Sequence, residues 1–290
     1  MRSVTVLAPA KLNLTLDITG TRPDGYHTVD MILQAVSLHE RVTVRKSRGF
    51  SLALPGSNVP ANEHNTAWKA ALAFFGETGL LAGAAVTVEK HAPVRAGMAG
   101  GSADAAAVLV ALNALYGARL SVAELCAIGA QVGADVPFCI LGGTARATGI
   151  GEVLEQLSPC PPCFFTVCMP KGGISTPQAY ARYDALGTDE RPDTAAALAA
   201  LRAGDLQALC AQMKNALSFS SAGRDTAPIC RILRENGAAA ALMTGSGAAV
   251  FGVFETRRAA SAARAALAAV YPRAWVLSPE RQGARIVHTA

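Results

Sequence analysis

Residues 93–105 form the segment of the chain best suited to bind a phosphate, Pro-Val-Arg-Ala-Gly-Met-Ala-Gly-Gly-Ser-Ala-Asp-Ala. Glycine has no Cβ, so the backbone at Gly97, Gly100 and Gly101 can turn and approach a ligand closely. A helix is predicted to follow at 103–117, and its first N–H groups, unpaired within the helix, favour an anion. These N–H groups, with the hydroxyl of Ser102 beside them, form the kind of turn that binds phosphate. The segment therefore predicts a phosphate-binding turn. A turn that only joins a strand to a helix is the alternative.

The spacing of these glycines differs from the two commonest nucleotide-binding loops. A Walker A loop needs a lysine directly after its last glycine, and here Ser102 follows Gly101. A dinucleotide-binding fingerprint needs Gly-x-Gly-x-x-Gly after a first strand, with an acidic residue about 20 residues on. No such residue stands out, so any phosphate site here is of another kind.

A predicted strand carries a second set of polar candidates. Apolar residues alternate there with polar ones: Leu12, Leu14, Leu16 and Ile18 with Lys11, Asn13, Thr15 and Asp17. This period predicts one buried face and one face that presents Lys11 and Asn13 to a polar group. Lys11 could be a cation near a transferring phosphoryl group, or a solvated side chain.

An aspartate between glycine and proline is the third candidate. Ser121 and Glu124 form a capping box, which predicts a helix that begins there and ends before Gly133. Asp135 lies in the Gly-Ala-Asp-Val-Pro segment that follows, and residues 136–147 are expected to form a strand or hairpin. Asp135 could act as a general base, orient a hydroxyl or cap a backbone group.

Two further turns carry polar groups. Tyr26 and His27 directly follow a turn signal at residues 21–25, and they could contact a base or be ordinary half-exposed residues. Gly245 and Ser246 belong to a second glycine turn, which could face a ligand or only join two strands.

Length and composition are those of a globular protein with a sizeable core. The chain has 290 residues, 51% of them hydrophobic and 16% charged, and a net charge of +5. No apolar run approaches the roughly 20 residues of a membrane span, and Lys11 interrupts the apolar stretch that a signal peptide needs. We expect a cytoplasmic protein with no membrane partner. The mild positive charge suits an anionic small substrate, and no basic stripe supports nucleic-acid binding.

The seven cysteines do not predict a disulfide framework, because their number is odd and they are scattered. Cys160 and Cys163 have the spacing of a redox motif, but no βαβ context and no second Cys or His pair accompanies them. We expect this pair to be structural or incidental, in a linker at 158–163.

The remaining pattern predicts α plus β structure with mixed connections. Strands are expected at 42–44, 51–54, 85–90, 164–169, 238–243, 248–254 and 274–278, the last closing the chain. Helices are expected at 65–79, 177–185, 193–203, 205–217, 226–236 and 256–270. The first of them is expected to place Trp68, Ala71, Leu72 and Phe75 on one face.

Taken in order, these motifs resemble those of the GHMP small-molecule kinases. The matching set is Lys-x-Asn at 11–13, Gly-Gly-Ser at 100–102, Gly-Ala-Asp-Val-Pro at 133–137 and Gly-Ser-Gly at 245–247. The resemblance extends from residue 8 to about residue 254. It implies an α+β, two-domain GHMP kinase fold. Residues 1–155 would form an N-terminal domain resembling the second domain of ribosomal protein S5, and residues 156–290 a C-terminal α/β sandwich domain.

The resemblance also implies roles on the nucleotide side. The implied ATP-binding residues are Asn65, Pro93, Ala96, Gly97, Met98, Ala99, Gly100, Gly101 and Ser102. Met98 stands where leucine is commoner in the family, a change that conserves volume. Asp135 would be the catalytic carboxylate and Lys11 its partner. Mg²⁺ would accompany ATP, with Ser102 as a candidate ligand.

The substrate is implied by the segments at 9–14 and 22–27, which resemble one kind of GHMP kinase in particular. That kind phosphorylates the 2-hydroxyl of a cytidine diphosphate derivative in isoprenoid precursor biosynthesis. The implied substrate residues are Asn13, Tyr26, His27, Asp135, Thr176, Tyr180, Gly245 and Ser246. Tyr26 and Tyr180 would enclose the cytosine ring.

Two other functions stay open. A GHMP kinase that acts on mevalonate or homoserine would not need Tyr26, His27 and Tyr180, because those substrates have no nucleobase. A non-catalytic nucleotide-binding homologue would need neither Lys11 nor Asp135. The expected assembly is a monomer or a weak homodimer.

Overall fold

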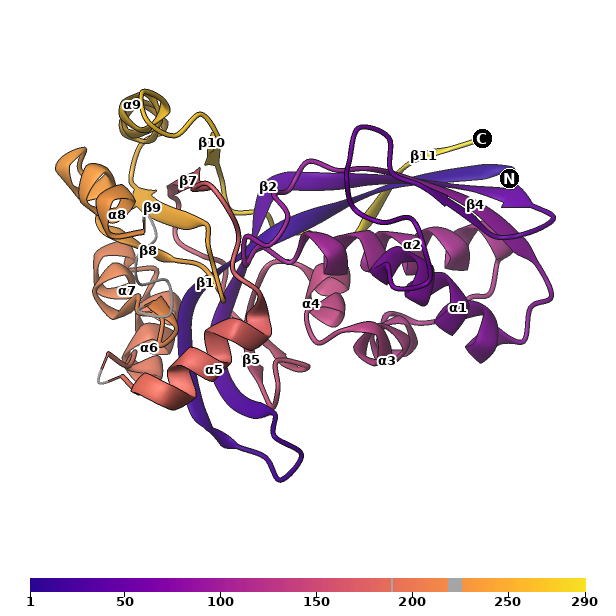
Figure 1. Cartoon of the computed structure of the whole chain (residues 1–290), viewed down its shortest axis with the longest axis horizontal. Coiled ribbons are helices and arrows are strands. Elements are labelled where there is room, and N and C mark those ends of the chain that lie inside the picture. Colours follow the sequence, from indigo (N-terminus) through magenta and orange to yellow (C-terminus); the bar gives the residue numbers. More distant parts are fainter. Residues whose placement is uncertain (189, 219–225) are drawn as a thin grey trace.

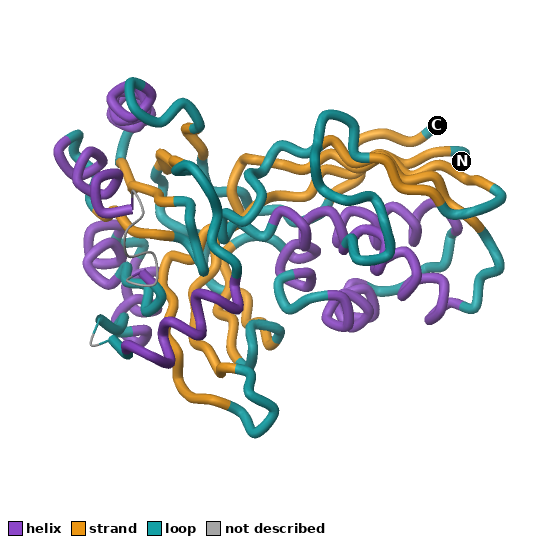
Figure 2. Tube along the Cα trace, in the orientation of Figure 1, coloured by secondary structure: helices purple, strands orange, loops and turns teal. Residues whose placement is uncertain are grey.

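Two β-sheets and the helices that cover them make up the protein. The computed structural model describes residues 1–188, 190–218 and 226–290. Figure 1 shows strands running through the middle of the molecule, and Figure 2 shows most helices in two groups, one toward each end. Within those described ranges, every helix is too short or too polar to cross a membrane.

A long antiparallel hairpin connects the two halves of the molecule. β1 (Ser3–Thr21) pairs with β2 (His27–Ser47) from one end to the other. The register shifts at several points, one of them between Pro9 and Ala10, and such irregularities bend a strand. The strand predicted from the alternation around Lys11 lies within β1, whereas β2 extends far beyond the strand expected at 42–44.

The hairpin is the centre of the larger sheet. Its other strands are β3 (Ser51–Ala53), β4 (Gly83–Glu89), β5 (Thr144–Thr148), β6 (Val153–Gln156) and β11 (Arg285–Thr289). The strand order is β11-β1-β2-β4-β3, with β5 paired to β2 and β6 to β5. All pairs are antiparallel except β3 with β4. The expectation that the strand at 274–278 is the last one is wrong, because β11 follows it and pairs with β1.

Helices cover one face of the larger sheet (Figure 1): α1 (Thr66–Thr78), α2 (Gly100–Tyr116), α3 (Val122–Val132) and α4 (Val136–Leu141). Asn65 and Gly79 cap α1, at the two ends of the helix expected at 65–79, and the predicted Ser121 capping box opens α3. The expected apolar face of α1 is confirmed in part: Ala71 is buried and Trp68 and Phe75 are partly buried, but Leu72 is 54% exposed. The helix instead buries Ala67, Ala70 and Phe74 beside Ala71.

The expected strand or hairpin at 136–147 is wrong for its first part. Val136–Leu141 forms α4, and Pro137 lies in its first turn, where a missing N–H breaks no hydrogen bond. Only the end of that range is strand, as β5. Asp135 immediately precedes α4, so this short helix fixes its position.

The smaller sheet belongs to the second half of the chain. It contains β7 (Phe164–Cys168), β8 (Ala240–Met243), β9 (Val250–Phe254) and β10 (Ala274–Leu277), in the order β10-β7-β9-β8. The helices of this half are α5 (Thr176–Leu186), α6 (Thr194–Ala203), α7 (Leu206–Gln212), α8 (Thr226–Glu235) and α9 (Arg257–Ala268). Each was expected from the sequence, and α7 is shorter than expected.

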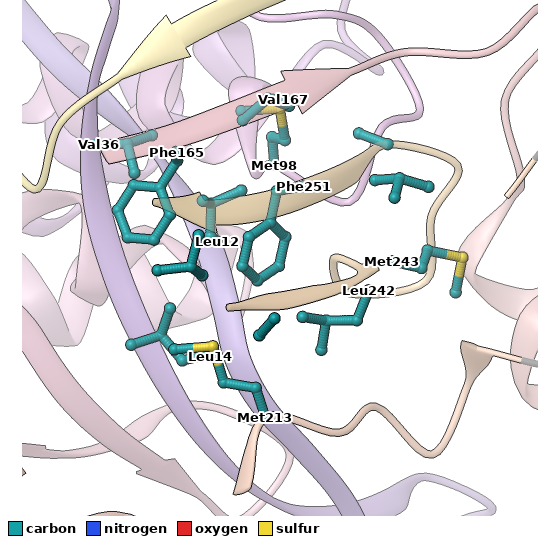
Figure 3. Close-up of a cluster of buried hydrophobic side chains, with 14 of the residues drawn as sticks. Leu12, Leu14, Val36, Met98, Phe165, Val167, Met213, Leu242, Met243 and Phe251 are labelled. Carbon is teal, nitrogen blue, oxygen red and sulfur yellow. The ribbon is translucent and has the colours of Figure 1, made fainter. Parts of the chain in front are cut away.

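Both hydrophobic cores include residues of the β1–β2 hairpin. One core buries its outer part, Val4, Val6, Val42 and Val44, with residues of α1, α2 and α3. The other buries the apolar residues of the ranges 10–18 and 29–36 with residues of the smaller sheet. Figure 3 shows Leu12 and Leu14 of β1 beside Phe165 and Phe251 of that sheet. The hairpin therefore positions residues of both halves relative to each other.

The linker expected at 158–163 lies between β6 and β7, and hence between the two sheets. Its two thiol sulfurs, of Cys160 and Cys163, are 3.9 Å apart and unlinked. Because β11 belongs to the larger sheet, the chain returns to its first half after completing the second. The division at residue 155 stays a prediction; that residue lies within β6.

Candidate active site

A cavity of about 1380 Å³ brings together motifs that are far apart in the sequence. It is lined by Lys11 and Asn13 of β1, the 24–27 turn, the glycine loop, residues 130–135, the first turns of α5, and the 245–247 turn. Segments of both halves of the chain therefore contribute to one site.

The glycine loop (residues 93–101) runs from β4 into the N-terminus of α2. The helix begins at Gly100, earlier than the predicted residue 103, so Gly100 and Gly101 carry its first N–H groups. Both glycines line the cavity. Free N–H groups and the positive end of the helix dipole suit the binding of a phosphate.

The backbone of the glycine loop is tightly constrained. Arg95, Gly97 and Ala99 have positive φ angles of 55°, 74° and 57°. A Cβ at Gly97 would collide with the carbonyl oxygen of Thr244, so this position requires glycine for space as well as for conformation.

Hydrogen bonds dock the loop on two other segments. Carbonyl groups within residues 95–98 accept hydrogen bonds from the N–H groups of Ala248 and Ala249, each 3.2 Å long, and of Lys11, 3.1 Å long. The late glycine turn predicted from the sequence thus lies directly against the glycine loop. The same loop also contacts the strand that carries the catalytic candidates.

Lys11 and Asp135 form an ion pair in the cavity. Lys11 Nζ lies 3.7 Å from Asp135 Oδ2 and donates a hydrogen bond of 2.7 Å to Asn13 Oδ1. The Lys11 side chain is 5% exposed and that of Asp135 is 31% exposed. A buried ammonium attracts a neighbouring negative charge more strongly than one in water. The carboxylate remains accessible to a ligand.

Asn13 is fixed by hydrogen bonds on several sides. Its N–H donates to Thr244 Oγ1 at 2.9 Å, and its Nδ2 lies 3.2 Å from the sulfur of Met31. Asn13 and Thr244 are both fully buried. Thr244 was not among the expected site residues, because a threonine before a glycine turn gives no specific signal.

Aromatic residues gather at the 24–27 turn and α5. The rings of His27 and Tyr180 stack with centroids 4.8 Å apart, and His27 Nε2 lies 2.6 Å from Asp184 Oδ1. Burial, with a smaller effect of the Asp135 charge, raises the pKa of Tyr180 to about 12, so its hydroxyl stays protonated. Tyr26 is 61% exposed, and its enclosure of a base together with Tyr180 stays a prediction.

The substrate candidates from the second half lie close to one another. The hydroxyl oxygens of Thr176 and Ser246 are 3.1 Å apart, and both residues line the cavity together with Gly245. A hydroxyl pair beside backbone N–H groups can donate hydrogen bonds to an anionic group.

Asn65 has a structural role as well as its predicted place near ATP. Its side chain accepts a hydrogen bond from Ala67 N at 2.9 Å, capping α1, and donates one of 2.8 Å to Pro60 O. Among the implied nucleotide and substrate residues, Ser102 is not in the cavity lining, so its metal-ligand role stays a prediction.

Sequence reasoning missed one buried ionic cluster beside the loop, formed by Lys90, Glu40 and Asp104. Burial and the charge of Glu40 raise the pKa of Asp104 to about 7, although Lys90 acts in the opposite direction. Burial lowers the pKa of Lys90, but Asp104 and Glu40 outweigh it, and the net pKa is raised. Lys90 and Asp104 line the cavity. Glu40 lies in β2, Asp104 in α2 and Lys90 directly after β4, and no local pattern indicates that they meet.

Two family models match the chain and define its class. The model of the GHMP kinases N terminal domain matches residues 65–143, which contain the glycine loop and Asp135. The model of the GHMP kinases C terminal domain matches residues 197–273. Fold and site are thus those of a GHMP kinase, an ATP-dependent small-molecule kinase.

Relatives and solved structures narrow this class. A 4-diphosphocytidyl-2-C-methyl-D-erythritol kinase of Pelotomaculum thermopropionicum is 42% identical over 254 residues, 86% of this chain and 88% of the relative. A crystal structure of 4-(cytidine 5'-diphospho)-2C-methyl-D-erythritol kinase, 35% identical, superposes with a TM-score of 0.79 over 94% of this chain and 98% of that one. The chain belongs to this 4-diphosphocytidyl-2-C-methyl-D-erythritol kinase family.

The fold alone does not distinguish substrates. A homoserine kinase from Cytophaga hutchinsonii has a TM-score of 0.80 at 18% identity, over 99% of this chain and 98% of that one. That likeness concerns the arrangement of helices and strands only. Substrate choice must therefore be argued from the residues of the cavity.

Proposed function

We propose that this chain transfers the γ-phosphoryl group of ATP to the 2-hydroxyl of 4-diphosphocytidyl-2-C-methyl-D-erythritol. The products are the 2-phosphate and ADP, in the non-mevalonate pathway of isoprenoid precursor biosynthesis. The observation that carries the proposal is the ion pair of Lys11 and Asp135, 3.7 Å apart, in a cavity also lined by the glycine loop, His27 and Tyr180.

The ion pair suits phosphoryl transfer, which depends on positioning and charge stabilisation more than on covalent chemistry. Asp135 holds the attacking 2-hydroxyl and receives its proton. Lys11 orients that carboxylate and stabilises the negative charge that develops on the transferred group. Asn13, hydrogen-bonded to Lys11 at 2.7 Å, directs the ammonium and lies beside the substrate.

The nucleotide binds at the glycine loop, with its phosphates at the N-terminus of α2 and its adenine near Asn65. Mg²⁺ keeps few protein ligands when it is bound to nucleotide phosphates. Among the described residues, no group of three or more His, Cys, Asp or Glu could hold a metal. Ser102 would be a candidate hydroxyl ligand of such an ion. When bound, Mg²⁺ would supply positive charge beside the phosphates.

The cytidine diphosphate part of the substrate lies along the second half of the cavity lining. Tyr26, His27 and Tyr180 contact the cytosine ring. Thr176 and Ser246, with hydroxyls 3.1 Å apart, contact the diphosphate together with Gly245 N–H. Aromatic faces and polar groups in one cavity match a substrate that has both a base and phosphates.

Mevalonate and homoserine kinases share the fold but need no base-stacking residues. A cavity for such small alcohols would not need the stacked pair of His27 and Tyr180, with centroids 4.8 Å apart. A non-catalytic nucleotide-binding protein would not need a buried lysine paired with a half-buried aspartate. A mevalonate or homoserine kinase therefore does not account for the stacked aromatic pair. A non-catalytic nucleotide-binding protein does not account for the ion pair.

A coupled assay of ADP release tests the proposal. The purified chain is assayed with ATP, Mg²⁺ and 4-diphosphocytidyl-2-C-methyl-D-erythritol, and in parallel with mevalonate and with homoserine. Turnover with the cytidyl compound alone is the expected result. Absence of turnover with it, or faster turnover with either alcohol, contradicts the assignment.

The same proposal includes the organisation of the enzyme. Residues 1–155 carry the ATP site and the catalytic pair, and residues 156–290 close over the substrate. The enzyme acts in the cytoplasm as a monomer or weak homodimer and binds no nucleic acid. Size-exclusion chromatography with light scattering at several concentrations tests the assembly.

A further inference from the structure

The ionic cluster found beside the cavity links the end of the glycine loop to the strand before it. Lys90, the residue after β4, donates hydrogen bonds of 2.6 Å to Glu40 of β2 and to Asp104 of α2. Its ammonium also lies 3.3 Å from the carbonyl oxygen of Gly100, the first residue of α2. One side chain thus contacts both the sheet and the first turns of the helix that the loop enters.

Glu40 holds the beginning of the same loop. Its Oε2 accepts the N–H of His91 at 2.8 Å, and its Oε1 accepts the N–H of Ala92 at 3.3 Å. Glu40 is fully buried and does not line the cavity. It can therefore affect a ligand only through the groups that it holds.

The glycine loop needs such support because its backbone is strained. Arg95 and Ala99 have positive φ angles without being glycine, a conformation that persists only when the surroundings hold it. The cluster is also costly, since Asp104 Oδ1 is buried with no hydrogen-bond partner among the described residues. A buried polar atom without a partner needs an explanation, and support of the loop supplies one.

We propose that Glu40 and Asp104 are positioning residues for nucleotide binding. Through Lys90 and the amides of residues 91–92, they fix the distance between the two ends of the glycine loop. That distance determines how the N-terminus of α2 meets the phosphates of ATP. The inference rests on the ATP-binding part of the proposed function, and not on the identity of the alcohol.

The decisive variant is Glu40→Gln, which keeps the shape and removes the charge. We measure its affinity for a non-hydrolysable ATP analogue with Mg²⁺ by calorimetry, and amide hydrogen exchange in residues 93–101. We expect affinity to fall about tenfold or more, because the loop is no longer preorganised, and exchange in the loop to rise. Affinity for cytidine diphosphate, used as a probe of the other site, should stay within about twofold.

The matched control is Asp30→Asn, on the same strand β2. It breaks a bidentate ion pair with Arg146, with both contacts 2.9 Å, at a position outside the cavity lining. Its affinity for the ATP analogue should remain that of the unmodified protein, even where its melting temperature falls. This control separates loss of an ion pair from loss of loop support.

An ATP-analogue affinity within twofold in folded Glu40→Gln protein overturns the inference, whatever its melting temperature. If Glu40→Gln does not fold, the affinity of Asp104→Asn for the ATP analogue is judged by the same limit of twofold. If neither variant folds, the cluster supports the whole domain rather than the loop, and the inference is also overturned. The criterion is the affinity for the ATP analogue alone, so failure with the cytidyl substrate in the turnover assay would leave this result standing.

Discussion

Lys11 and Asp135 face each other across 3.7 Å, although one lies in the middle of β1 and the other just before α4. The ion pair therefore connects the central hairpin to the helical layer. Lys11 is buried, and removal of the partner of a buried charge has larger effects than removal of a surface charge. Substitutions at this pair should consequently change catalysis sharply.

Asp135→Asn should lower kcat by a factor of about 10² to 10⁴, the usual contribution of a positioned acid or base. The amide keeps the size of the side chain but cannot receive the proton of the hydroxyl. Affinity for an ATP analogue should be unchanged, which calorimetry checks. An unchanged kcat in the coupled assay would remove Asp135 from the catalytic role.

Tyr180→Ala should raise KM for the cytidyl substrate by a factor of about 5 to 100, since stacking of a base on an aromatic ring contributes about 1–3 kcal/mol. KM for ATP should hardly change. Tyr180→Phe keeps the ring that stacks on His27 and serves as the control, with a KM close to that of the unmodified enzyme. Equal effects of Tyr180→Ala on both KM values would contradict base stacking.

Gly97→Ala should damage the nucleotide site, because its methyl group would collide with the carbonyl oxygen of Thr244. Steady-state kinetics should show a raised KM for ATP. Gly117→Ala, with a φ of +62° and open space around it, is the control for backbone strain alone. It should cost roughly 1 kcal/mol of stability and leave KM for ATP unaltered. Similar kinetics for the two variants would argue against a special constraint at Gly97.

Asn65→Ala should lower the free energy of unfolding by about 0.5–2 kcal/mol through loss of the α1 cap, and should also raise KM for ATP. Asp193 caps α6 in the same way, accepting a hydrogen bond from Ala196 N at 2.9 Å, and is outside the cavity lining. Asp193→Ala should match the loss of stability without the change in KM. A change in KM for both variants would indicate a general effect of helix fraying.

Stability should fall as the pH rises from about 4 toward 7, because of Asp104. Its pKa is raised from 3.8 to about 7 in the folded protein, by burial and by the charge of Glu40 against the opposing effect of Lys90. The folded chain therefore holds a proton that the unfolded chain releases over this range, and proton release favours unfolding. Urea unfolding at several pH values should show a flatter profile for Asp104→Asn. An identical profile would contradict the raised pKa.

Signals from neighbouring residues predicted most of the helices and strands. The Ser121 capping box and the Asn65 cap define helix starts through contacts within one turn, so they can be read from a few neighbouring residues. The helix at 136–141 was not predicted, because glycine and proline usually indicate the end of a helix. Pro137 instead lies in the first turn, where proline is favourable.

The order of the motifs predicted the residues that line the cavity. It did not predict the residues that hold the glycine loop in place. Lys11, Asp135 and the glycine loop each carry a recognisable pattern, and the structure brings them into one cavity. Glu40 carries none, because its role depends on Lys90 and Asp104 arriving from other elements. The pairing of β11 with β1 was missed for the same reason: strand pairing across the whole chain has no local signature.

The β1–β2 hairpin also bears on how the protein unfolds. Its outer residues pack in one hydrophobic core and its inner residues in the other, so loss of either core removes packing from part of the same hairpin. The two halves therefore lack the independence of domains joined by a flexible linker. A destabilising change in either half should therefore lower the melting temperature of both, which scanning calorimetry checks.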